Sequence, residues 1–243
     1  MSNWKNVFGI IWTGQLFSIL SSSIVSFALI LWLSFETGSA EVLALSALAA
    51  LLPQSVIGLV AGVYIDRWDR RRTMIAADSF IAFCTLLLAV LFFLHMAEIW
   101  HIYVLLALRS VGSAFHMPAM QASIPLLAPA DQLGRIAGIN QMLESVCNIA
   151  GPALGALFIG LMDISYILLL DVGGALMACL SLLFVRIPNP EQDENNRTGI
   201  WIELKEALHI VKKIKGITPL VLFSVLSTFV IMPVAVLFPL MTL

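Results

Sequence analysis

Several ionisable side chains interrupt long apolar stretches of the sequence, among them Arg109, His116, Glu144 and Asp171. A charge in the hydrocarbon of a membrane is costly, so it normally faces a partner or an aqueous cavity and marks a candidate functional site. At 1.5 Å per helical residue, Arg109 and Asp171 come to similar depths, and so do His116 and Glu144. Two acid–base pairs are therefore geometrically possible.

Such carboxylates could carry protons. Burial favours the neutral form of a carboxyl group, whereas a neighbouring arginine favours the ionised form, so a change of surroundings can load or release a proton near neutral pH. We expect proton coupling or substrate contact at Glu144 and Asp171. A purely structural ion pair is the alternative for each.

Further residues share a helical face with these groups. Gly112 and His116 follow Arg109 at i+3 and i+7, which places all three on one side of a helix. An outward-pointing Arg109 that only packs the bundle is the alternative. A second stripe passes from polar to small residues and faces protein or water: Gln141, Glu144, Asn148, Gly151 and Gly155.

A cluster of charges follows the second apolar stretch in the string GVYIDRWDRRR. The alternative without a specific function is a stop-transfer signal. Gly58 and Gly62 lie four residues apart, a spacing that permits close helix approach. Asp66 then stands at the membrane boundary, where we expect it to be nearly desolvated and to need a partner such as Arg67, Arg71 or a helix amino terminus. Asp78 is a candidate gate or latch partner.

The elements that must position these residues are membrane-spanning helices. Of the 243 residues, 60% are hydrophobic and 12% charged, whereas soluble domains carry about a quarter of charged residues. A bilayer core needs roughly 20 apolar residues per helix. We expect spans within 7–35, 41–66, 73–95, 102–125, 136–161 and 166–185, and a seventh from about 217. Because the seventh reaches Leu243 without a flanking loop, we expect a truncated protein, with a seven-span architecture as the alternative.

The distribution of basic residues predicts the orientation. With a cytoplasmic amino terminus, every one of the thirteen basic residues except Arg109 falls in a cytoplasmic segment, as the positive-inside rule requires. We divide the chain into a six-span bundle at 1–186, a cytoplasmic linker at 187–216 and the first span of a second bundle at 217–243. Within the linker, apolar residues at helical spacing predict an amphipathic helix at the membrane surface.

Several of these strings resemble the major facilitator superfamily. The loop matches its G-x-x-x-D-R-x-G-R-R pattern at Gly62, Asp66, Arg67, Arg70 and Arg71, with Asp69 in place of a glycine. The resemblance implies that this loop latches the two halves of a carrier in the outward-facing state. R-x-x-G at Arg109 and Gly112 resembles the fourth-span motif associated with proton coupling.

The fifth stretch resembles the motif of exporters, G-x-x-x-G-P-x-x-G-G, at Gly151, Pro152 and Gly155, with Cys147 and Ala156 departing from it. A glycine–proline kink made only for packing is the alternative.

Longer strings, such as NWKNVFGIIWTGQ and RSVGSAFHMPA, resemble the bacterial macrolide-efflux group. That resemblance implies an all-α, twelve-span fold of two six-helix bundles, of which this chain lacks the carboxy-terminal half. It also implies export of a bulky amphiphilic drug in exchange for protons across the bacterial cytoplasmic membrane. Exporters of siderophores or lipids on the same scaffold, and a non-transporting membrane fragment, are the alternatives.

Other classes fit less well. An enzyme would need a nucleophile–base pair or a metal cluster. The histidines, and the cysteines Cys84, Cys147 and Cys179, have no metal-ligand spacing, and no P-loop is present. A channel would need a pore lined by several chains. We therefore expect no catalytic residue, metal or cofactor. We expect a small molecule and protons as ligands, the lipid bilayer as surroundings, and no nucleic acid.

Overall fold

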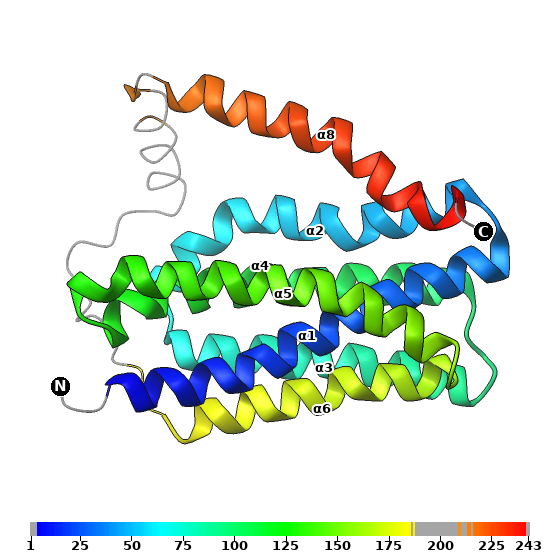
Figure 1. Ribbon diagram of the computed structural model, residues 1–243, viewed down its shortest axis with the longest axis horizontal. Helices are drawn as coiled ribbons and strands as arrows, with labels where there is room; N and C mark the ends of the chain where they lie inside the picture. The colour runs from blue at the N-terminus through cyan, green and yellow to red at the C-terminus, as the bar shows by residue number, and fades with distance from the viewer. Residues whose placement is uncertain (1–3, 186, 188–208, 210–212, 215, 242–243) are drawn as a thin grey trace.

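The computed structural model describes residues 4–185, 187, 209, 213–214 and 216–241. These residues form helices and connecting turns, with no strand among them. Figure 1 shows the helices in chain order: α1 Trp4–Thr37, α2 Ala40–Arg67, α3 Arg70–Phe93, α4 Ile99–Leu127, a short 3-10 helix Ala130–Gln132, α5 Leu133–Ile159, α6 Ile164–Leu183 and α8 Ile217–Met241.

The six helices α1 to α6 are each long and apolar enough to cross a membrane. This confirms the six predicted spans of an all-α membrane fold, each helix extending beyond its predicted core by a few residues at one or both ends. A helix also begins at Ile217, where the seventh span was expected. The predicted amphipathic helix of the linker lies outside the described residues.

The bundle is built around α1. This helix packs on α5 and α6, α3 packs on α4 and α6, and α2 packs on α4, while α8 lies beside α2 at the edge of the bundle (Figure 1). Large apolar side chains point away from the bundle, among them Phe83 and Ile149, which are 58% and 76% exposed. Exposing these apolar surfaces to water would cost free energy, whereas lipid solvates them.

Small residues set how closely the helices approach. A Cβ atom on Gly155 of α5 would lie 2.9 Å from the carbonyl oxygen of Ile24 in α1, and one on Gly174 of α6 would lie 2.8 Å from that of Phe17. Between membrane helices, where lipid is as apolar as leucine, such close backbone packing is a main source of association. Glycine is therefore required where α5 and α6 cross α1.

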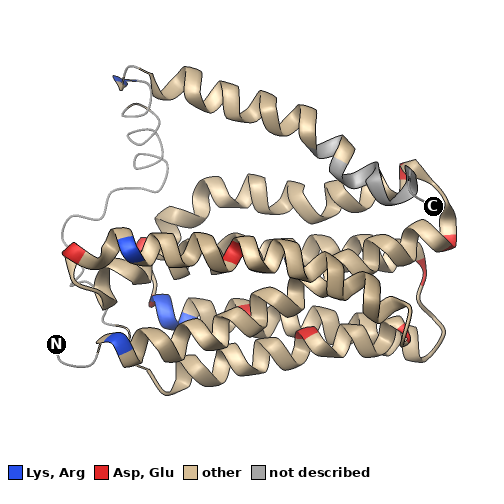
Figure 2. Cartoon of the chain, viewed as in Figure 1, with Lys and Arg blue, Asp and Glu red and all other residues tan. Residues whose placement is uncertain are grey.

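Charged residues divide between the two ends of the bundle. Basic residues gather at the end where the amino terminus lies, whereas the opposite end shows acidic residues only (Figure 2). The helix bounds agree: Arg67 ends α2 and Arg70 begins α3 at the first end, while Glu41 lies in the first turn of α2 at the second. We call these the arginine end and the acidic end.

Candidate functional site

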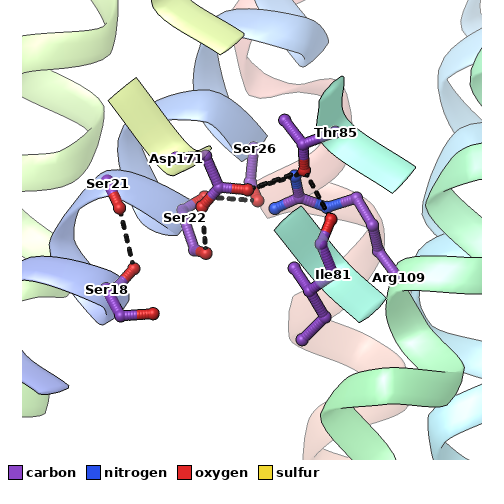
Figure 3. Close-up of polar contacts among 8 residues, drawn as sticks. All are labelled: Ser18, Ser21, Ser22, Ser26, Ile81, Thr85, Arg109 and Asp171. Atoms are coloured by element: carbon purple, nitrogen blue, oxygen red, sulfur yellow. Dashed lines mark hydrogen bonds and ion pairs between the residues drawn. The ribbon is translucent and has the colours of Figure 1, made fainter. Parts of the chain in front are cut away.

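Two buried charges form an ion pair between α4 and α6. Arg109 Nη1 lies 2.5 Å from Asp171 Oδ2, and the two residues are 8% and 1% exposed. The hydroxyl of Thr85 in α3 donates to Asp171 at 2.7 Å and accepts a hydrogen bond from Arg109. Ser22 of α1 donates to the other carboxylate oxygen at 2.5 Å. Figure 3 shows how these side chains from four helices converge.

The depth of this pair follows from the helix starts at the acidic end. Arg109 is ten residues into α4 and Asp171 seven residues into α6, which corresponds to about 15 Å and about 10 Å. The long arginine side chain spans the difference. The structure thus brings together the two residues that the sequence placed at similar depth. Ser22 and Thr85 were not predicted, because neutral hydroxyls in an apolar stretch give no distinctive signal.

A second buried polar cluster lies nearer the arginine end. His116 Nε2 of α4 is 3.3 Å from Asp78 Oδ1 of α3, and Gln15 Nε2 of α1 donates to Asp78 Oδ2 at 3.4 Å. All three residues are buried. His116 is therefore paired with Asp78 and not with Glu144, the pairing that the sequence left possible. His116 and Glu144 do lie at equal depth, but α4 packs mainly on α2 and α3, so His116 faces α3 rather than α5.

Glu144 instead lines a cavity of about 270 Å³ between α1, α4 and α5. It is half-buried, eleven residues into α5, which places it about 16 Å from the arginine end. Around it the wall is formed by Gln15, Met120, Gln121 and Asn140 together with aliphatic side chains. The Trp12 indole donates to the Asn140 amide oxygen at the same wall. The cavity therefore combines an apolar lining with one carboxylate and several amides.

A second hollow, of about 550 Å³, lies between α2 and α4 and shares Met117 and Gln121 with the first. The two hollows therefore flank one face of α4. Gly112, predicted on the same face as Arg109, is buried against α3, the helix that Arg109 also contacts through Thr85. A Cβ atom on Gly112 would lie 2.7 Å from Ile81 Cγ1. Its role in this structure is close packing of α3 on α4.

The charged loop at the arginine end differs from expectation in two ways. Asp66 was expected to be desolvated, but its side chain is 74% exposed and lies 3.7 Å from Arg70 Nη2. Gly62 and Gly58 were expected to permit helix approach, but a Cβ atom on either would meet nothing within 4 Å. Both features have the same cause: no described helix covers this face of α2.

Two residues of the loop stabilise helix ends. Asp69, which replaces the glycine of the superfamily pattern, is the N-cap of α3 and accepts a hydrogen bond from the Arg72 backbone at 2.7 Å. Arg71 reaches the far end of α6, donating to the carbonyls of Leu182 and Leu183 at 2.7 and 2.9 Å. Carbonyls in the last turn of a helix lack the usual partner four residues further on, and arginine is well suited to bind them.

The glycine–proline segment of α5 lies against α1. Gly151 and Gly155 are buried, with no room for a Cβ atom beside Ser23 and Ile24. The Ser23 hydroxyl donates to the Cys147 carbonyl at 3.1 Å, one turn before Pro152. This hydrogen bond ties α1 to the backbone of α5 just before the proline, whose missing N–H would have bonded the Asn148 carbonyl. The packing role of this segment is thus visible in the contacts.

Among the described residues no group of three or more His, Cys, Asp or Glu side chains could hold a metal ion. The chemistry offered by the site is that of buried acid–base pairs and a cavity with a carboxylate in its wall.

This fold, six apolar helices around buried polar pairs, is that of a multi-pass membrane protein. The sequence matches the Major Facilitator Superfamily over residues 11–243, and the chain belongs to that superfamily. It is 38% identical over 243 residues to Macrolide efflux protein A of Streptococcus pyogenes, covering 100% of this chain and 60% of that protein. It is also 38% identical over 207 residues to the protein of the same name from Enterococcus faecalis, covering 85% of this chain and 64% of that one.

More distantly, the chain is 26% identical over 227 residues to Multidrug efflux pump Tap of Mycobacterium tuberculosis, covering 89% of this chain and 53% of the pump. The chain thus spans about three fifths of the length of the macrolide-efflux relatives. The resemblance noted in the sequence to the macrolide-efflux group is confirmed by these matches.

Proposed function

We propose that the chain forms the amino-terminal bundle of a secondary carrier that exports amphiphilic, cationic drugs in exchange for protons. The observation that carries the proposal is Glu144, a half-buried carboxylate in the wall of an otherwise largely apolar cavity. Attraction between a cation and a carboxylate strengthens as water is excluded. The names of the relatives, a macrolide efflux protein and a multidrug efflux pump, support drugs as the cargo.

Proton exchange follows if a proton and a cationic drug compete for Glu144. Binding of one then weakens binding of the other by the same factor, because linkage between two ligands is reciprocal. Drug binding releases a proton, and a proton arriving from the far side expels the drug. The Arg109–Asp171 ion pair, to which Thr85 also donates a hydrogen bond, joins α4 to α6. In this scheme it serves as a second proton-sensitive element.

The basic residues at the arginine end support a cytoplasmic location for that end, by the positive-inside rule. The carrier would then lie in the bacterial cytoplasmic membrane with its amino terminus inside. The exposed face of α2 around Gly62 and Asp66 offers a surface for a second helical bundle, the part that the superfamily loop motif is proposed to latch.

Drug binding measured against pH in the parent and in Glu144→Gln tests the proposal. The variant mimics the protonated state, so it should bind cationic drugs far more weakly than the parent and lose the dependence on pH, while neutral drugs change little. Asp131→Asn is the matched control, because Asp131 is exposed beside α5 and does not line the cavity. Identical pH dependence in parent and Glu144→Gln would remove Glu144 from the mechanism and leave Asp171 as the next candidate.

Transport is tested separately in vesicles, with this chain and with a version extended by the carboxy-terminal part of Macrolide efflux protein A. Drug uptake into inverted vesicles that depends on a proton gradient, and that collapses with a protonophore, is the expected result for the extended version. Uptake that persists without any ion gradient would contradict secondary transport.

A further inference from the structure

Helices α2 and α3 each pack on α4 but barely contact each other, so α4 forms the floor between them. A hollow of about 650 Å³ lies over this floor at the arginine end of the bundle. It shares no described lining residue with the cavity around Glu144 or with the hollow between α2 and α4. It is therefore a separate candidate site, which the proposed drug binding does not use.

The mouth of this hollow is cationic. Arg67 lines it from the last turn of α2 and Arg72 from the first turn of α3, together with Asp69, the N-cap of α3. Asp69 accepts a hydrogen bond from the Arg72 backbone at 2.7 Å, so its carboxylate is held at the helix end. In the described lining two guanidinium groups accompany one carboxylate, and the mouth has a net positive charge. Guanidinium groups present their donors in a planar fork that matches the oxygens of a phosphate.

Behind its mouth the hollow is apolar. Ala76 and Phe80 of α3 line one wall, and Phe115 of α4 lines the floor. Phe80 lies ten residues after Arg70, the first residue of α3, which corresponds to about 15 Å along the helix, half of a hydrocarbon core of roughly 30 Å. Trp68 marks the mouth: its half-exposed ring stacks on Phe115 at a centroid distance of 5.9 Å, and tryptophan favours the level of the lipid headgroups. The hollow therefore spans the depth of one leaflet.

We propose that this hollow binds one anionic phospholipid, with the phosphate at Arg67 and Arg72 and an acyl chain along Phe80. A soluble anion would meet the arginines but leave the apolar wall unused. A zwitterionic phospholipid would fill the wall but also bring a cationic group to the cationic mouth. An anionic phospholipid matches both parts, and it would connect the charged loop to α3 and α4.

Native mass spectrometry of the purified chain in a neutral detergent tests the proposal. Phosphatidylglycerol and phosphatidylcholine with the same acyl chains are titrated separately, and the affinity of the first bound lipid is measured. The parent should bind phosphatidylglycerol more tightly than phosphatidylcholine. Arg72→Gln should weaken phosphatidylglycerol binding by about fivefold, the value of one basic residue beside an anionic lipid surface, and should leave phosphatidylcholine binding unchanged. Arg67→Gln combined with Arg72→Gln should weaken phosphatidylglycerol binding further, by about 25-fold in all.

Arg135→Gln is the matched control for charge, because Arg135 is an exposed arginine in the first turn of α5 at the arginine end and does not line the hollow. It should keep the affinities of the parent. Ala76→Trp fills the apolar part without changing any charge, because Ala76 is exposed and lines the hollow. It should abolish the tight binding of phosphatidylglycerol, whereas Ala153→Trp, at an exposed position of α5 outside the hollow, should not.

Three results would each overturn the lipid site. Equal affinity of the parent for the two lipids would mean that the mouth does not select a negative charge. Equal weakening by Arg72→Gln and Arg135→Gln would mean that lipids are attracted by the basic end as a whole. Tight binding that persists in Ala76→Trp would place the lipid outside the hollow. The measurement uses neither a drug nor a proton gradient, so its outcome is independent of the role proposed for Glu144.

Discussion

Arg109 and Asp171 lie 2.5 Å apart with almost no exposure to solvent, and their side chains join α4 to α6. Neither charge has water to stabilise it, so each depends on the other and on the hydroxyls of Ser22 and Thr85. A buried pair of this kind contributes little net stability as a whole, but breaking it leaves an uncompensated charge.

Removing one partner of this pair should therefore lower the free energy of unfolding by more than removing both partners. We expect Arg109→Met alone and Asp171→Leu alone each to lower the free energy of unfolding by about 3–5 kcal/mol, and the two changes together to lower it by less. Unfolding of the purified protein in detergent, arranged as a double-mutant cycle, measures the coupling. Additive effects of the single changes would show that the two side chains do not interact.

Two substitutions at Asp69 test whether its side chain acts as a helix cap or only stands in a tight turn. Asp69→Ala removes the side-chain acceptor for the Arg72 backbone and should cost about 1 kcal/mol, whereas Asp69→Gly should cost only a few tenths. Thermal unfolding of the two variants provides the comparison. Equal losses for alanine and glycine would show that the side chain does not act as a cap.

Two glycines of α5 should respond in opposite directions to alanine. Gly155→Ala puts a Cβ atom 2.9 Å from the backbone oxygen of Ile24, so it should destabilise the protein by about 1–3 kcal/mol. Gly138→Ala meets nothing within 4 Å, so it should be neutral or stabilise the helix by up to about 1 kcal/mol. The midpoint of thermal unfolding reports both. A stable Gly155→Ala variant would mean that α1 and α5 do not pack this closely.

The orientation is tested by labelling single cysteines in a background whose native cysteines are replaced by alanine. Ala40→Cys and Met162→Cys lie at the acidic end and should react with a membrane-impermeant reagent added outside intact cells. Asp131→Cys, at the arginine end, should react only after the membrane is opened. Gly38 is avoided because its φ of +56° strains any other residue. Labelling of Asp131→Cys in intact cells would reverse the proposed topology. The linker position Asn195, an equally informative site by sequence, lies outside the described residues.

Much of the fold could be predicted from the sequence, because membrane helices are set by length and apolar content. The depth of a residue along such a helix follows from its rise alone, which is why Arg109 and Asp171 were placed together. Depth does not give the direction in which a side chain points. His116 and Glu144 are at the same height, yet one faces α3 and the other a cavity beside α1.

The remaining site residues escaped prediction for a related reason. Gln15, Ser22 and Thr85 are neutral, and their importance comes only from the charged groups that other helices bring to them. Asp66 was misjudged because its position at the end of an apolar stretch suggested burial, whereas burial depends on which helix covers it. No described helix does so.

Arg71 donates a hydrogen bond to the Leu182 carbonyl at the end of α6, although it lies 111 residues earlier in the chain. During translation, α3 is complete long before α6 has been made, so this arginine spends that interval without the carbonyls it later binds. Closure of the bundle therefore waits for residue 183 to leave the ribosome. Nascent chains arrested before that residue should remain sensitive to proteases at the charged loop, whereas those arrested well beyond it should become resistant there.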